Sequence, residues 1–136
     1  SDNLAKPKKD GKLERVNGKF GKALKFNGEG ANVVEVPSVA KLAGMKALTI
    51  AAWTKPGGIK GADGMSIASK RIGHQNGDCY NLFTWTGQKM HARVNSKGQI
   101  ISNTILKDKE WYHVAFTFEG GRGSVSRSSR QSGVRR

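Results

Sequence analysis

The sequence predicts an all-β fold in which two antiparallel β-sheets pack face to face as a β-sandwich. From residue 20 onward, hydrophobic and polar residues alternate with the period of two that half-buried strands show, and no helical period competes with it. The chain has 18 glycines against 3 prolines, which favours a turn-rich β protein over a helical bundle. Its 136 residues suit one domain.

The first two predicted strands flank a turn signal. Ala23–Phe26 and Asn32–Val36 are short alternating segments, and the Asn-Gly-Glu-Gly run at 27–30 between them is typical of a hairpin turn. Pro37 ends the second strand because proline has no N–H to donate to a sheet. The segment Ser38–Met45 is expected to hold one helical turn.

Six further strands follow, separated by turns that contain glycine, proline, asparagine or serine. Eight short strands with turn signals between them are typical of a sandwich. The six are Ala47–Lys55, Met65–Lys70, Cys79–Thr86, Lys89–Asn95, Gln99–Leu106 and Trp111–Glu119.

Two of these strands show their faces clearly. One face of each strand is apolar and is predicted to pack inward, whereas the other face meets solvent or a ligand. In the first, Met90, Ala92 and Val94 alternate with Lys89, His91, Arg93 and Asn95; in the second, Tyr112, Val114, Phe116 and Phe118 alternate with Trp111, His113, Ala115 and Thr117.

Charge and composition divide the chain into three predicted segments. The formal net charge is +14, and residues 1–16 form a basic N-terminal extension ahead of a domain at 17–121. Residues 122–136 hold five arginines, no acid and few apolar side chains, so this tail is predicted to be disordered. It would bind nucleic acid only non-specifically, through phosphates. No apolar stretch is long enough to insert into a membrane, and a single cysteine, Cys79, excludes an internal disulfide.

Five segments, in order, resemble the laminin G-like branch of the concanavalin A-like lectin jelly rolls. The resemblance covers 17–121 and implies a jelly roll, a role in binding glycans and an extracellular or cell-surface location. The matching runs are Gly18–Gly28, Val33–Pro37, Leu48–Pro56 (Leu-Thr-Ile-Ala-Ala-Trp-Thr-Lys-Pro), Ile67–Lys70 and Trp111–Gly120 (Trp-Tyr-His-Val-Ala-Phe-Thr-Phe-Glu-Gly).

The chain departs from the family after this last run. Relatives continue with at least two more strands, whereas here the Arg/Ser tail follows. The jelly roll is therefore expected to be incomplete at the C-terminus, with unpaired strand edges that invite another chain. This predicts a homo-oligomer whose subunits cover one another's edges.

Catalysis is not expected. The superfamily includes glycoside hydrolases, which need two carboxyl groups flanking the scissile bond. Only Asp108 and Glu110 have a suitable spacing, and they lie in a predicted turn between lysines.

A carbohydrate-binding module is the leading interpretation. Aromatic faces stack on sugars, and arginine and lysine donors match the sulfate or carboxylate of an acidic polysaccharide. The alternative is an extracellular protein-interaction or adhesion module without glycan binding, which is favoured if Trp53, Trp85 and Trp111 are all buried. The candidate ligand-binding residues are Trp85, Lys89, His91, Arg93, Asn95, Trp111 and His113.

No cofactor is expected, although many relatives bind calcium in loops. The resemblance places Asn27 where the family often has an aspartate, and Asp63 and Asp78 are the other loop candidates. Calcium takes six to eight oxygen ligands, usually several of them anionic, so the neutral residue at the matching position and the net charge of +14 disfavour an intact site without excluding one.

Overall fold

A computed structural model describes most of the chain, which divides into two compact units, Ser1–Met45 and Lys46–Arg136. The described residues are 6–7, 13–28, 33–37, 45–58, 64–71, 78–95, 97–119 and 122–128.

The first unit consists of short antiparallel pairs. β1 (Lys6–Pro7) pairs with β4 (Val34–Glu35), and β2 (Glu14–Asn17) pairs with β3 (Lys22–Lys25). The predicted hairpin between 23–26 and 32–36 is therefore wrong. β3 instead pairs with the strand before it, because a tight turn closed by the Gly18 N–H and the Gly21 carbonyl (2.9 Å) brings β2 back on β3. The predicted helical turn at 38–45 lies outside the described residues, except for Met45.

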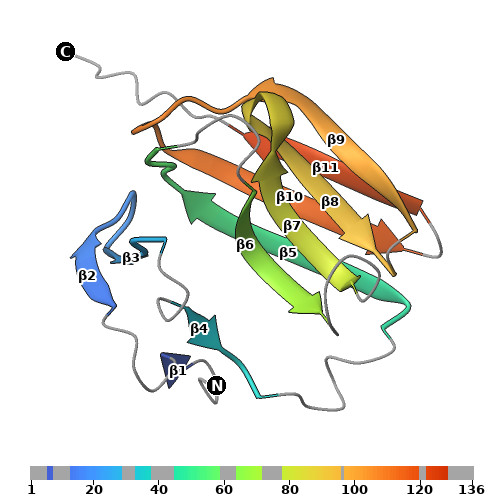
Figure 1. The fold of residues 1–136 in the computed structure, drawn as a ribbon, viewed down its shortest axis with the longest axis horizontal. Helices are drawn as coiled ribbons and strands as arrows, with labels where there is room; N and C mark the ends of the chain where they lie inside the picture. The colour runs from blue at the N-terminus through green and yellow to red at the C-terminus, as the bar shows by residue number, and fades with distance from the viewer. Residues whose placement is uncertain are drawn as a thin grey trace. The chain divides into compact units, whose positions relative to one another are not determined.

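The second unit consists of two antiparallel sheets, which lie one behind the other in Figure 1. The three-stranded sheet has the order β11-β10-β5, with β5 (Ala47–Thr54), β10 (Tyr112–Glu119) and β11 (Arg122–Ser128). The four-stranded sheet has the order β6-β7-β8-β9, with β6 (Met65–Arg71), β7 (Asp78–Trp85), β8 (Lys89–Val94) and β9 (Lys97–Ile105), and the 3₁₀ turn η2 (Thr86–Gln88) joins β7 to β8.

The core of this unit lies between the two sheets. Burying these apolar side chains stabilises the fold by about 25 cal/mol for each Å² removed from water. The inward faces predicted for Lys89–Asn95 and Trp111–Glu119 are confirmed, and with them the β-sandwich. The buried cluster joins Leu82, Met90 and Ala92 of the four-stranded sheet to Tyr112, Val114 and Phe116 of the three-stranded sheet, with Leu106 from the segment after β9.

β11 departs from the sequence-based expectation. Residues 122–128, expected to be disordered, form a strand that pairs with β10 along its length, with Val125 opposite Phe116. The expectation considered only the apolar surface that the tail could bury. Backbone hydrogen bonds to an existing strand edge need little apolar surface from the added strand. The sandwich thus extends to Ser128, and residues 129–136 lie outside the described part of the chain. Among the described residues, no helix has the length and apolar character that spanning a bilayer requires.

Replacing Gly123 with alanine is expected to lower the free energy of unfolding by about 1 kcal/mol, the low end of the usual cost of overpacking, because the end of the Ile100 side chain has to turn aside. A Cβ at this position of β11 would lie 2.5 Å from Ile100 Cδ1 of the facing sheet and 3.4 Å from Phe116 Cε2. Urea denaturation monitored by tryptophan fluorescence measures the change. Gly57→Ala is the control, because no atom lies within 4 Å of the added Cβ there. Equal changes for the two variants would contradict the packing seen at Gly123.

Removing the Tyr112 hydroxyl is expected to cost about 1–2 kcal/mol of stability, since a buried hydrogen-bond partner is lost. This hydroxyl accepts the Lys107 N–H (2.9 Å) and donates to Glu110 Oε2 (2.8 Å), which fixes the turn before β10. Thermal unfolding of Tyr112→Phe measures the loss. Tyr80→Phe is the control, because among the described residues the Tyr80 hydroxyl has no hydrogen bond. A Tyr112 variant as stable as the control would show that the turn does not depend on this hydroxyl.

Candidate functional site

The outer face of the four-stranded sheet brings polar and aromatic side chains together. In β7 and β8 the residues Leu82, Met90 and Ala92 face the core, so the alternate residues share the opposite face. Register places these alternate residues directly across from one another, as the pairs Asn81 and Arg93, Phe83 and His91, and Trp85 and Lys89. We refer to Phe83, Trp85, His91, Arg93 and Gln99 of β9 as the Arg93 cluster.

The Arg93 guanidinium lies over two aromatic rings. Its Cζ is 5.5 Å from the centroid of Phe83 and 5.7 Å from that of Trp85, and these rings are 6.2 Å apart. Both distances are within the range of a cation–π interaction. The His91 ring lies 5.4 Å from Phe83 and 6.2 Å from Trp85, so four flat groups pack on one another.

Gln99 joins Arg93 to His91. The Nε and Nη2 groups of Arg93 donate to Gln99 Oε1 at 2.9 and 2.6 Å, and Gln99 Nε2 is hydrogen-bonded to His91 Nδ1. Because an amide nitrogen only donates, Nδ1 is the acceptor, as in the neutral imidazole that carries its proton on Nε2. The guanidinium is thus held by two hydrogen bonds and two ring contacts, which limits its motion before any ligand arrives.

His91 itself does not face solvent. The prediction that the polar row of β8 is solvated is wrong at this residue, which is only 4% exposed. The cause is the packing of the Phe83 and Trp85 rings against the imidazole. His91 therefore positions Gln99 and Arg93 rather than meeting a ligand.

The accessible part of this face carries cations next to an aromatic ring. Trp85, Lys89 and Arg93 are half-buried, so each presents part of its side chain to solvent. Ile101 and Ile105, which pair with His91 and Lys89, are 50% and 57% exposed. Such a surface can stack on a flat apolar partner while donating hydrogen bonds to an anion.

The four strands carry mostly positively charged side chains. Five lysines and arginines stand against one carboxylate, which gives these strands a net charge of +4 with His91 neutral. Of these cations, Lys89 and Arg93 are the ones that register places on the outer face, and positive charge there raises the local concentration of anionic ligands. The residues are Lys70, Arg71, Lys89, Arg93 and Lys97 against Asp78.

The other predicted site residues lie elsewhere. His113 belongs to the three-stranded sheet, where its ring is 5.3 Å from Trp53. Trp111 directly precedes β10 of that sheet, and Lys55 Nζ is 5.9 Å from its ring. Asn95 begins the turn after β8 with φ 51°, and its N–H donates to the Cys79 carbonyl. The structure thus brings together four of the seven predicted residues, Trp85, Lys89, His91 and Arg93.

Two members of the cluster, Phe83 and Gln99, were not predicted. Phe83 could have been found from the turn at Gly87. Phe83 and His91 lie equally far from Gly87 along the chain, so a hairpin centred on this glycine places them opposite one another. Gln99 has no comparable signal. β8 and β9 are paired with register shifts on either side of His91 and Ala92, so counting along the chain does not align them.

A family model identifies the chain. The model described as the concanavalin A-like lectin/glucanases superfamily, of the laminin G type, matches residues 27–127. The chain belongs to this superfamily. The match confirms the laminin G-like resemblance and the jelly-roll class. It ends within β11, which agrees with a domain that includes this strand. No curated protein and no solved structure gave a significant match.

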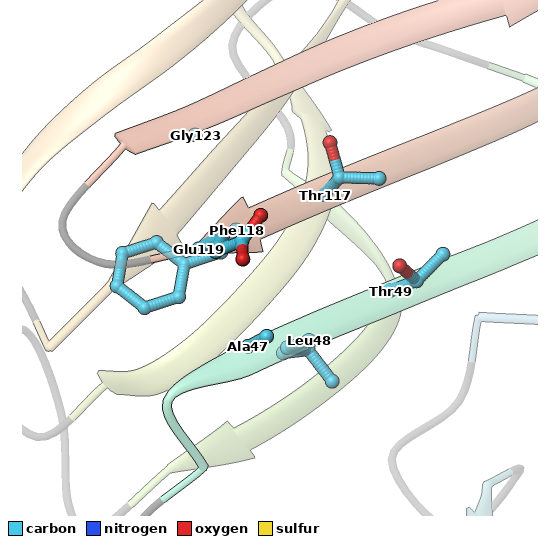
Figure 2. Close-up of a pocket in the computed structure, with 7 residues that line it drawn as sticks. All are labelled: Ala47, Leu48, Thr49, Thr117, Phe118, Glu119 and Gly123. Atoms are coloured by element: carbon cyan, nitrogen blue, oxygen red, sulfur yellow. The ribbon is translucent and has the colours of Figure 1, made fainter.

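The superfamily includes both lectins and glucanases. Because glycoside hydrolysis needs two carboxyl groups, the positions of the carboxylates bear on which of the two activities the chain could have. Asp108 and Glu110 lie in the turn before β10, where Glu110 accepts a hydrogen bond from Tyr112. Glu119, at the end of β10, lines an open pocket of about 390 Å³. Figure 2 shows this pocket across β5, β10 and β11, lined by Ala47, Leu48, Thr49, Thr117, Phe118, Glu119 and Gly123.

The calcium candidates lie in different parts of this superfamily member. Asp63 lies outside the described residues, Asn27 belongs to the first unit, and Asp78 begins β7. Within the described ranges, no three histidine, cysteine, aspartate or glutamate side chains are grouped to hold a metal.

Proposed function

We propose that the protein is a non-catalytic carbohydrate-binding module that binds an acidic polysaccharide on the outer face of its four-stranded sheet. The observation that carries this proposal is the Arg93 guanidinium, held over Phe83 and Trp85 by Gln99. Trp85, Lys89 and Arg93 are the residues that would meet the ligand, and His91 would position them.

The chemistry of this face suits a sugar acid. The C–H surface of a pyranose packs on an indole face, and the planar guanidinium matches a carboxylate or sulfate with two parallel hydrogen bonds. A guanidinium already fixed by neighbours loses little entropy when it binds, which increases affinity. Lys89 and Arg93, which share this face, favour an anionic over a neutral glycan.

The positions of the carboxylates favour binding without hydrolysis. A glycoside hydrolase places two carboxyl groups about 5–9.5 Å apart on either side of the scissile bond. Asp108, Glu110 and Glu119 belong to β10 and the turn before it, whereas the Arg93 cluster lies on the other sheet. We therefore expect no release of reducing sugar from any ligand that binds.

The tryptophans favour glycan binding over the adhesion module considered from the sequence. That alternative expected Trp53, Trp85 and Trp111 to be buried, and all three are only half-buried. Partly exposed indoles are the usual platforms for sugars. An extracellular or cell-surface location is part of this proposal.

A glycan array at physiological salt tests the proposal with three proteins: the full chain, Arg93→Ala and a chain ending at Ser128. We expect the full and shortened chains to bind the same uronic or sulfated polysaccharides, and Arg93→Ala to lose them. Binding that disappears with residues 129–136 would assign the affinity to the arginine tail instead. No binding by the full chain would contradict the proposal and favour the adhesion module.

A further inference from the structure

Two isoleucines of β9 lie on the outer face of the four-stranded sheet, next to the Arg93 cluster. β9 is the last strand in the order of this sheet and lies beside β8 (Figure 1). Register places Ile101 opposite His91. It also places Ile105 opposite Lys89, and the two isoleucines are 50% and 57% exposed. Single exposed apolar residues are normal on protein surfaces, but two that lie together can bind an apolar group.

An irregularity in β9 brings these two side chains together. The residues of β8 that face them are two positions apart, whereas Ile101 and Ile105 are four positions apart, so β9 holds two extra residues here. A regular strand would separate the isoleucines by about 13 Å, but opposite their partners they lie about 7 Å apart between Cα atoms. Because the shift is an even number of residues, both side chains keep the outward direction. We refer to Ile101 and Ile105 as the isoleucine pair.

Hydrogen bonds of Ser102 hold this bulge in place. The Ser102 hydroxyl accepts the Met90 N–H and donates to the Thr104 carbonyl, both at 3.2 Å. Beyond the bulge, the Leu106 N–H donates to the Gln88 carbonyl at 2.8 Å, which fixes the end of the strand. The position of the isoleucine pair is therefore set by the sheet and does not depend on a ligand.

We propose that the isoleucine pair and Lys89 form a subsite for an acetyl group of the acidic polysaccharide. The subsite rests on the proposed function and adds that the ligand is acetylated. The methyl of the acetyl group packs on the isoleucines, and its carbonyl oxygen accepts a hydrogen bond from the Lys89 ammonium, which has three donors. A methyl without a carbonyl, as in a deoxy sugar, offers the ammonium no acceptor.

The distance between this subsite and Arg93 suits one polysaccharide chain. Arg93 is two residues beyond the partner of Ile101, so the two residues are diagonal neighbours about 8 Å apart. A carboxylate bound by Arg93 and an acetyl group on the same sugar or the next one can therefore be bound together. A second copy of this chain packed through the same face would bring like charges together, so an anionic occupant is favoured.

Isothermal titration of the full chain with two forms of one ligand tests the proposal. The two forms are an O-acetylated oligogalacturonate and the same oligosaccharide after alkaline removal of its acetyl esters. We expect the acetylated form to bind about tenfold more tightly, since burying a methyl group and forming one hydrogen bond each raise the affinity severalfold. A third ligand, which alternates uronic acid with an N-acetylated amino sugar, tests an acetyl amide in place of the ester.

Variants of the isoleucine pair connect this preference to the site. Ile101→Thr and Ile105→Thr keep a β-branched side chain, which strands favour, but remove most of its apolar surface. We expect each variant to lose most of the preference for the acetylated ligand and to bind the deacetylated form like the wild type, which also shows that it is folded. Ile101→Val and Ile105→Val are the controls, because they keep an apolar side chain, and we expect them to retain the preference.

The outcomes separate the acetyl subsite from the proposed function. A loss confined to an acetylated ligand supports the subsite, and the ligand affected shows whether the acetyl group is an ester or an amide. Threonine variants that bind both acetylated ligands like the wild type overturn the subsite, as does a loss that extends equally to the deacetylated form, while binding of acidic polysaccharide stands. If the wild type binds none of the three ligands, the proposed function fails and the subsite with it.

Discussion

Replacing Phe116 with alanine is expected to lower the free energy of unfolding by about 3–5 kcal/mol, because Phe116 is among the largest fully buried side chains of the described residues. Phe116 is fully buried in the centre of β10, where it lies between Ile50 of β5 and Val125 of β11. Its ring also faces the four-stranded sheet within the common core. Because domains are stable by only about 5–15 kcal/mol, the variant is expected to be partly unfolded at 37 °C.

Urea denaturation measures this loss, with two further variants as controls. Phe116→Leu fills most of the space and is expected to lose less than half as much stability. Phe20→Ala removes a ring that is 71% exposed and is expected to change stability by less than about 0.5 kcal/mol. If Phe116→Ala and Phe20→Ala were equally stable, the two sheets would not share the core described above.

Replacing Arg93 with alanine is expected to weaken the binding of an acidic oligosaccharide about 10- to 100-fold, since hydrogen bonds to charged groups contribute about 1.5–3 kcal/mol. The substitution removes the cation that the Phe83 and Trp85 rings and Gln99 hold in place. Isothermal titration with a uronic acid oligosaccharide measures the affinity.

Two matched variants separate geometry from charge. Arg93→Lys keeps the charge but loses the planar fork, so it is expected to recover only part of the affinity. Lys107→Ala removes an exposed cation in the turn before β10, which leads into the other sheet, and is expected to change the affinity less than twofold. Full recovery by Arg93→Lys would mean that charge alone binds the ligand, which would contradict the role given to the guanidinium.

The sequence predicted the faces of a strand correctly where one face is wholly apolar. Tyr112, Val114 and Phe116 of β10 are buried as the alternation indicated. In β7 both faces carry large or polar side chains, with Asn81, Leu82, Phe83 and Thr84 all buried. Alternation cannot show which face of such a strand points to the core, because the aromatic and polar side chains on the outer face also bury one another.

The strand pairings were predictable only where a turn fixed them. The Gly87 turn aligns β7 with β8, and Trp85, Lys89 and Arg93 follow from that alignment. β11 was missed because its pairing depends on the edge of β10 rather than on apolar residues of its own. The hairpin predicted for β3 and β4 failed because each strand pairs with an earlier part of the chain.

The most direct test of the proposed function is an NMR titration of the ¹⁵N-labelled full chain with a uronic acid oligosaccharide. The expected result is that amide shifts change in Phe83, Trp85, Lys89, Arg93 and Gln99, and that the Arg93 Nε–H and Trp85 Nε1–H signals move with them. Shift changes confined to residues 129–136, or to the pocket beside Glu119, would contradict binding on the outer face of the four-stranded sheet.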